Sequence, residues 1–218
     1  VCMKARSQNV SHPTAVGEDG RPKEYVQREF GWQVTADDLV AKSDKDKASG
    51  KPTDEFLRGQ KYGRTIYGRG TRWIWCYPSC GKDAHYMAAA VQDFIGPGVT
   101  IRSFVSDNAK ELVKCAMELG FCTQNSIPGV SQTNGVGERA NRTVLEGCRA
   151  ALMQAGFHES AWPLAIQCFC FLRNLSPRTK GKSPWKARFG DDPNDEFKGH
   201  LIPFGSLINY RPSPIVEK

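Results

Sequence analysis

Acidic residues in three segments could together bind a pair of hard metal ions. Asp107 comes just after an apolar run at residues 99–105, and Glu138 lies in Asn-Gly-Val-Gly-Glu-Arg, in the first turn of a helical pattern. Asp37 and Asp38 supply a third acid upstream. Carboxylate oxygens are the ligands that Mg²⁺ and Mn²⁺ prefer. Two such ions held together catalyse in-line phosphoryl transfer on nucleic acid, so the acids predict this chemistry if the fold gathers them.

Each acid also has an ordinary structural interpretation. Asp107 or Asn108 could cap the helix that follows, and Glu138 could pair with Arg142 four residues later. On a helical wheel of about 100° per residue, however, Glu138 lies at the border of the apolar stripe. Arg142 and Arg149 lie close to it on that wheel. A carboxylate in this position could reach both a metal ion and a DNA phosphate.

Hydrophobic periodicity predicts the elements that would position these acids. The chain begins its folded part with a strand at 33–40, continues with a hairpin, and then alternates helices with strands. A flexible stretch at 127–133 precedes the long helix that carries Glu138. The expected strands are 33–40, 64–67, 72–77, 99–105 and 121–123, and the expected helices are 82–94, 108–119, 134–155 and 160–174. This order favours an α/β fold with a mixed sheet and a core at 31–190.

The segments outside the expected core are polar and basic. Residues 1–30 are typical of a tail, 41–63 of an exposed basic loop, and 191–218 of a C-terminal extension. The net charge is +7 and the pI is about 9.0. Much of the excess lies between residues 42 and 72, where nine Lys and Arg face four Asp and Glu. A basic balance of this kind favours polyanionic partners.

Nothing in the sequence indicates a membrane or a disulfide framework. No stretch reaches eighteen apolar residues, and no charged-then-apolar leader opens the chain. Six of the eight cysteines fall in apolar segments, where a free thiol behaves as a small hydrophobic group. We therefore expect a reducing compartment, nuclear or cytoplasmic. Because the chain begins at Val1 rather than Met, we expect a piece of a longer polypeptide.

Two of these segments together resemble a known signature. Ser106-Asp107-Asn108 followed by Asn134-Gly135-Val136-Gly137-Glu138-Arg139 is similar to the motif of integrases from copia-type retrotransposons and retroviruses. The resemblance covers roughly residues 30–210. The third strand of the family resembles Arg72-Trp73-Ile74-Trp75-Cys76-Tyr77-Pro78, and its flexible loop resembles Ser131-Gln132-Thr133-Asn134-Gly135. The continuing helix resembles Asn141-Arg142-Thr143-Val144-Leu145-Glu146. The segment after the core resembles Ser183-Pro184-Trp185-Lys186-Ala187-Arg188-Phe189-Gly190.

The resemblance implies a fold and an activity. The fold is ribonuclease H-like, with a five-stranded mixed sheet flanked by helices. The activity is that of a polynucleotidyl transferase that uses two Mg²⁺ or Mn²⁺ ions for 3′-end processing and strand transfer of element DNA. It implies that the chain binds DNA and that it forms a homo-oligomer with further copies of itself. It also implies a zinc-binding module before the core, of which Cys2 would be a remnant.

The same resemblance gives Asp37, Asp107 and Glu138 as metal ligands. Asp38 competes with Asp37, because successive strand residues face opposite ways and only one can point at the metals. Thr-Ala-Asp favours Asp37, whereas the apolar pair Leu-Val after Asp38 favours Asp38. The interval between Asp107 and Glu138 is shorter than in the family, and Ala109 replaces a common Gly.

Contacts to DNA are expected mainly at phosphates, with weak sequence preference and strong salt dependence. The candidate DNA-binding residues are Gln132, Asn134, Arg139, Arg142, Arg149 and Lys110. Two other functions remain open from the sequence. One is a non-catalytic DNA-binding or interaction domain derived from a retroelement, and the other is a metal-dependent nuclease of the same fold.

Overall fold

The computed structural model describes residues 29–41, 56–106, 110–121, 123–125, 131–177, 182–190 and 197–209. Within them the order of strands and helices predicted between residues 33 and 174 is confirmed, and a helix at 184–189 was not predicted. The elements are β1 (Val34–Val40), η1 (Leu57–Gly59), β2 (Tyr62–Gly68), β3 (Ile74–Ser79), α3 (Ala84–Ile95), β4 (Phe104–Ser106), α4 (Lys110–Glu118), β5 (Thr123–Asn125), α5 (Ser131–Ala155), η2 (Glu159–Ala161), α6 (Trp162–Leu175) and α7 (Pro184–Phe189).

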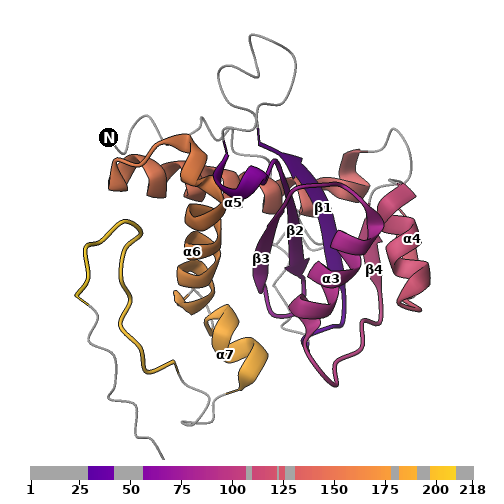
Figure 1. Ribbon diagram of the computed structural model, residues 1–218. Coiled ribbons are helices and arrows are strands. Elements are labelled where there is room, and N and C mark those ends of the chain that lie inside the picture. The colour runs from indigo at the N-terminus through magenta and orange to yellow at the C-terminus, as the bar shows by residue number, and fades with distance from the viewer. Residues whose placement is uncertain are drawn as a thin grey trace, which may run out of the picture.

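The strands form one sheet in the order β3-β2-β1-β4-β5 (Figure 1). β1 lies in the middle, antiparallel to β2 over seven residue pairs and parallel to β4. β3 is antiparallel to β2, and β5 is parallel to β4. The predicted α/β class, with a mixed sheet flanked by helices, is therefore confirmed. The central place of β1 means that both of its edges are paired with neighbouring strands.

Helices cover both faces of the sheet and form two separate cores. In Figure 1, α3 crosses in front of the strands and α5 runs behind them. Val34 and Ala36 of β1 belong to the core under α3 and α4. Leu39 of β1 belongs to the core under α5 and α6. Side chains therefore alternate between the two faces along β1, as the period of a strand requires.

The long helix α5 packs its predicted apolar stripe against the sheet. Ala140, Val144, Cys148 and Leu152 are all buried there. At Gly147 an added Cβ would lie 2.1 Å from the ring of Phe169 on α6, so a glycine permits the close crossing of these two helices. The two helices thus form one tightly packed layer behind the sheet.

Three sequence expectations about element lengths are wrong. The strand expected at 99–105 is confined to β4, residues 104–106, because only two of its residues pair with β1. The basic loop expected to extend to residue 63 ends earlier, since Phe56 is buried against Trp162 and β2 begins at Tyr62. The stretch expected to be flexible up to residue 133 is already helical from Ser131. Residues 42–55 and 126–130 lie outside the described part of the chain.

The segments beyond the expected core are only partly described. The tail at 1–28, including Cys2, lies outside the described residues. Part of the C-terminal extension packs on the domain: the Phe197 ring lies 5.2 Å from Phe171 and 5.8 Å from Trp185. Among the helices that the structure describes, none combines the length and the apolarity needed to cross a bilayer.

The cysteines support a testable expectation about reactivity. Cys76, Cys115, Cys148 and Cys170 are buried, and all the described cysteines are free thiols. Burial raises the pKa of Cys148 and Cys170 to about 12 and that of Cys115 to about 11. The pKa of Cys76 is also raised well above its usual value, mainly by burial. The reactive thiolate is therefore scarce at these four positions near neutral pH.

Among the cysteines that the structure describes, we expect iodoacetamide at pH 8 to alkylate the exposed Cys80 first in the folded protein. The four buried thiols should become reactive only in denaturant, which peptide mass spectrometry can follow. Alkylation of Cys148 or Cys170 as fast as Cys80 under native conditions would contradict the packing of α5 and α6 against the sheet.

Candidate active site

Asp37 lies on the face of β1 that is covered by α5. The alternation along β1 puts it on the same face as Leu39, and its side chain is half-buried. Asp37 and Glu138 line the same pocket, which has a volume of about 440 Å³. The strand and the start of the long helix therefore present two carboxylates to one open space.

Basic side chains from α5 line the same pocket. Arg142 and Arg149 stand four and eleven residues after Glu138, on one stripe of the helix. Glu138 and both arginines are exposed, as their position at the edge of the apolar stripe predicts. Glu146 also lines the pocket, so its lining includes both acids and cations. This arrangement places potential phosphate contacts directly beside the carboxylates.

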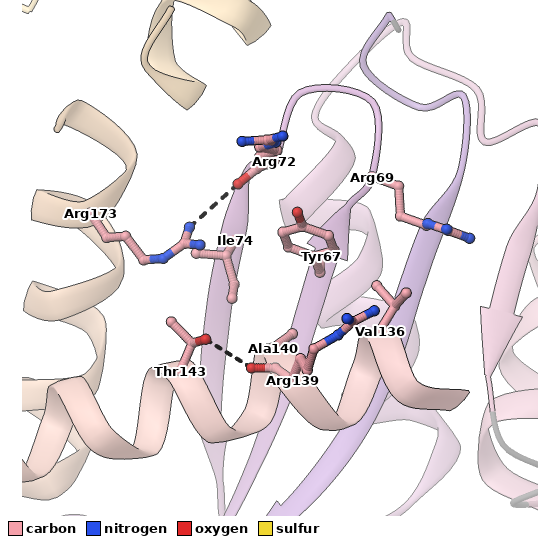
Figure 2. Close-up of a pocket in the computed structure, with 9 residues that line it drawn as sticks. All are labelled: Tyr67, Arg69, Arg72, Ile74, Val136, Arg139, Ala140, Thr143 and Arg173. Carbon is pink, nitrogen blue, oxygen red and sulfur yellow. Dashed lines mark hydrogen bonds between the residues drawn. The ribbon is translucent and has the colours of Figure 1, made fainter. Parts of the chain in front are cut away.

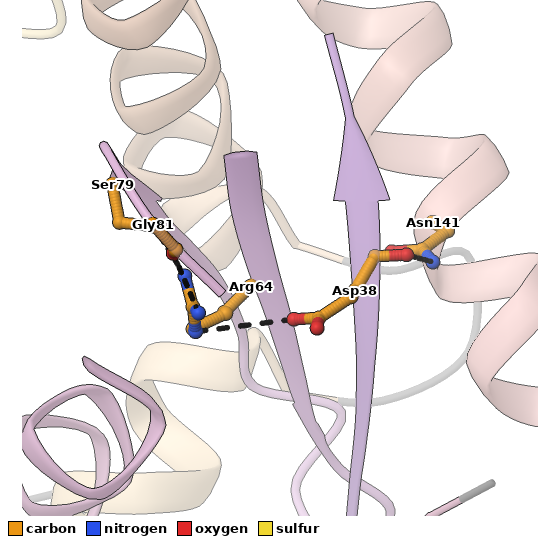
Figure 3. A network of polar contacts seen from close by, with 5 residues as sticks. All are labelled: Asp38, Arg64, Ser79, Gly81 and Asn141. Carbon is orange, nitrogen blue, oxygen red and sulfur yellow. Dashed lines mark hydrogen bonds and ion pairs between the residues drawn. The ribbon is translucent and has the colours of Figure 1, made fainter. Parts of the chain in front are cut away.

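Asp38 points to the opposite face of the sheet, where it meets a buried arginine (Figure 3). Its Oδ1 lies 3.9 Å from Nε of Arg64, whose side chain is only 1% exposed. Arg64 also donates to the hydroxyl of Ser79 and, at 2.8 Å, to the carbonyl of Gly81. The structure therefore gives Asp38 a structural partner and leaves Asp37 as the β1 acid that faces Glu138.

Asn141 links the helix to the strand at this point. Its Nδ2 donates to the backbone carbonyl of Asp38 at 3.4 Å (Figure 3). Asn141 lies one turn after Glu138 and lines the same pocket. The bond therefore holds the start of α5 against β1, which fixes Glu138 relative to Asp37. Sequence reasoning assigned Asn141 only to the continuing helix and missed this contact.

The third predicted acid, Asp107, lies outside the described residues, as does Asn108. The chain is described up to Ser106, at the end of the strand that pairs with β1. The side chains of Lys110, Gln132 and Asn134 are also outside the described part, although their backbones belong to α4 and α5. Within the described residues, no three His, Cys, Asp or Glu side chains are grouped closely enough to hold a metal ion.

Arg139, another predicted DNA-binding residue, lies apart from Arg142 and Arg149. It lines a different pocket, together with Arg69, Arg72 and Arg173 (Figure 2). Sequence analysis counted Arg69 and Arg72 within the basic segment but did not single out Arg173. Arg173 stands near the end of α6, and only the tertiary packing brings it to the other three.

Comparison with known proteins shows what the chain is similar to. No protein-family model matches it. Its homologues are retrovirus-related Pol polyproteins of copia-type transposons, and its fold is similar to that of a chain in a retroviral intasome. The resemblance identified from the acidic motifs is therefore confirmed, and the relatives are consistent with an integrase core.

Two of the proteins that are similar in sequence come from plants. The chain is 32% identical over 133 residues, 56% of its length, to the Pol polyprotein from transposon TNT 1-94 of Nicotiana tabacum. It is 28% identical over 138 residues, 57% of its length, to that from transposon RE1 of Arabidopsis thaliana. The matches span only 10% and 9% of those polyproteins.

One solved structure with a similar fold is a chain of the simian T-cell lymphotropic virus intasome in complex with the PP2A regulatory subunit B56 gamma. The TM-score is 0.58 at 12% identity, over 94% of this chain and 66% of that one. At this identity the likeness concerns the fold alone.

Proposed function

We propose that this chain is the catalytic core of a retroelement integrase, a polynucleotidyl transferase that joins element DNA to target DNA. The observation that carries the proposal is the shared pocket of Asp37 and Glu138, with Arg142 and Arg149 at its edge. The homology to transposon Pol polyproteins supports the same function. The order of antiparallel and parallel strands supports a ribonuclease H-like fold.

The donor set of the pocket suits Mg²⁺ or Mn²⁺. Its lining residues offer carboxylate and amide oxygens and neither His nor Cys, which are the ligands typical of zinc. Asp37 and Glu138 are the proposed ligands, and Asp107 is the third, by its place in the sequence motif. When bound, two such ions stabilise the attacking and leaving oxygens of an in-line displacement.

The other residues of the pocket would position DNA. The guanidinium groups of Arg142 and Arg149 would bind backbone phosphates next to the carboxylates, because arginine forks match phosphate oxygens. The contact of Asn141 with β1 keeps Glu138 in place as DNA binds. Contacts of this kind are to the backbone, so binding should depend strongly on salt and weakly on sequence.

The test is a joining assay with labelled duplex oligonucleotides in Mn²⁺. We expect the wild type to form joined product and the variants Asp107→Asn and Glu138→Gln to form none. Cleaved but unjoined DNA would assign the chain to the nucleases instead. Salt-sensitive DNA binding without any metal-dependent product would show a non-catalytic binding domain. Size-exclusion chromatography with and without DNA tests the homo-oligomer that the resemblance implies.

A further inference from the structure

We call the pocket of Asp37 and Glu138 the acidic pocket. A second pocket lies beside α5, away from the first, and is lined by four arginines (Figure 2). We call it the arginine pocket. Arg69 and Arg72 come from the turn between β2 and β3, Arg139 from α5 and Arg173 from α6. The volume is about 350 Å³. Three segments that are distant in sequence thus bring the same functional group to one place.

Four cationic side chains line the arginine pocket. None of the residues that line it is acidic. Arg72 and Arg173 are half-buried, whereas Arg69 and Arg139 are exposed. Like charges gathered at a partly buried site repel one another, and an anion between them relieves that repulsion. Guanidinium groups bind phosphate with two parallel hydrogen bonds, so phosphate is the anion that this group of side chains fits.

Backbone carbonyls hold two of these side chains in place. Nε of Arg139 donates to the carbonyl of Gly135 at 2.9 Å, and Nη1 of Arg173 donates to the carbonyl of Arg72 at 3.4 Å. In Figure 2 the Arg173 side chain extends from α6 toward the hairpin. The guanidinium of Arg139 has five N–H donors, and its bond to the carbonyl of Gly135 uses one of them. The side chains are therefore partly ordered before any ligand binds, which lowers the entropic cost of binding.

The backbone at Arg72 is an independent sign of function. Its φ is +61°, in the left-handed region where glycine is the usual residue. A side chain in this conformation costs free energy, and such costs are concentrated at binding and catalytic sites. An arginine at this position therefore places a cation at the pocket against the preference of the backbone.

We propose that the arginine pocket binds backbone phosphates of DNA outside the reacting phosphodiester. The inference rests on the proposed function, because the ligand proposed for the arginine pocket is DNA. Glu138 and Arg139 are neighbours about 100° apart on α5 and line different pockets. The first half of the helix thus holds the acidic pocket on one side and a phosphate site on another. The arginine pocket would keep the DNA in register while the carboxylates act at the scissile position.

The test measures DNA affinity in EDTA, so that binding is separate from catalysis. The full 218-residue chain is titrated into a labelled 20-base-pair duplex at several salt concentrations. For the double variant Arg139→Gln, Arg173→Gln, we expect the slope of log K against log salt to fall by about two, about one per lost phosphate contact. Arg102→Gln is the matched control. It removes one exposed cation that pairs with Glu29, and the slope should not change.

A second variant separates binding from stability. Arg72→Gly removes a cation but suits the positive φ, so the melting temperature should stay at or above that of the wild type while the salt slope falls by about one. A lower melting temperature with unchanged DNA binding would overturn the proposal. So would a double variant whose salt slope equals that of Arg102→Gln.

Two further outcomes would also count against the proposal. Displacement of DNA by poly-glutamate at an equal concentration of anionic groups would assign the arginine pocket to acidic peptides. If the wild type fails to bind DNA even at low salt, the proposed function fails together with this inference. If the wild type binds and joins DNA while the double variant is unaffected, only this inference fails.

Discussion

Asp37→Asn should abolish metal-dependent joining or cleavage of DNA, whereas Asp38→Asn should preserve it. Asp37 is a proposed metal ligand, and the removal of a metal ligand costs several kcal/mol of transition-state stabilisation, so the loss for Asp37→Asn should be on the order of 10³-fold or more. The two residues are adjacent and chemically identical, so each is a matched control for the other. Only Asp37 shares the pocket with Glu138.

Asp38→Asn should instead lower stability. Arg64 is buried, and its charge would lose the carboxylate that lies 3.9 Å away. Removal of one partner from a buried pair costs about 3 kcal/mol, even where the intact pair contributes little. Urea unfolding followed by circular dichroism measures this cost, and it should be small for Asp37→Asn.

A readout without DNA distinguishes the two roles further. Mn²⁺ should raise the melting temperature of the wild type and of Asp38→Asn, because a ligand that binds only the folded state stabilises it. Mn²⁺ should raise the melting temperature of Asp37→Asn much less. If Asp38→Asn were folded but inactive and insensitive to Mn²⁺, while Asp37→Asn stayed active, the assignment of the β1 acid would be wrong.

Asn174→Leu should cost about 3–5 kcal/mol of folding free energy, because it leaves two buried backbone groups without a partner. Asn174 is fully buried on α6. Its Oδ1 accepts from the N–H of Ile74 at 3.1 Å, and its Nδ2 donates to the carbonyl of Ile74 at 2.7 Å. β3 is an edge strand, so these groups of Ile74 have no neighbouring strand to bond.

The measurement is again the free energy of unfolding in urea. Ser176→Ala, two residues further along, is the control: it removes an exposed hydroxyl that donates to the carbonyl of Leu172, and the effect should stay within about 0.5 kcal/mol. Asn174→Asp should also destabilise the fold, since it removes a donor and buries a charge. A value for Asn174→Leu within 1 kcal/mol of the wild type would show that α6 does not bond the sheet edge.

The sequence predicted the elements better than it predicted their side-chain environments. The prediction of the apolar stripe of α5 was correct because a helix that is covered on one side repeats its apolar residues every three to four positions. The choice between Asp37 and Asp38 could not be made in this way. β1 is covered on both faces, with Val34 and Ala36 on one and Leu39 on the other, so its apolar residues mark no single inner face.

Contacts between distant segments account for the rest. The burial of Arg64 depends on Asp38, Ser79 and Gly81, which come from a different strand and from the end of the hairpin. Phe56 was not predicted to be buried, because the average composition of its segment is that of a solvated loop. Arg173 joins three other arginines only after α6 has packed beside the hairpin. None of these neighbours is encoded in local spacing.

The tandem acids of β1 have a consequence for how the sheet is assembled. A slip of one residue along β2 in one direction would bring Asp37 to the fully buried place of Ala36 and would carry Asp38 away from Arg64. A slip in the other direction would bring Asp38 to the buried place of Leu39. Either misalignment of β1 on β2 would therefore bury one carboxylate in an apolar core. The pair of aspartates thus discourages the wrong alignment during folding, in addition to any part that one of them takes in chemistry.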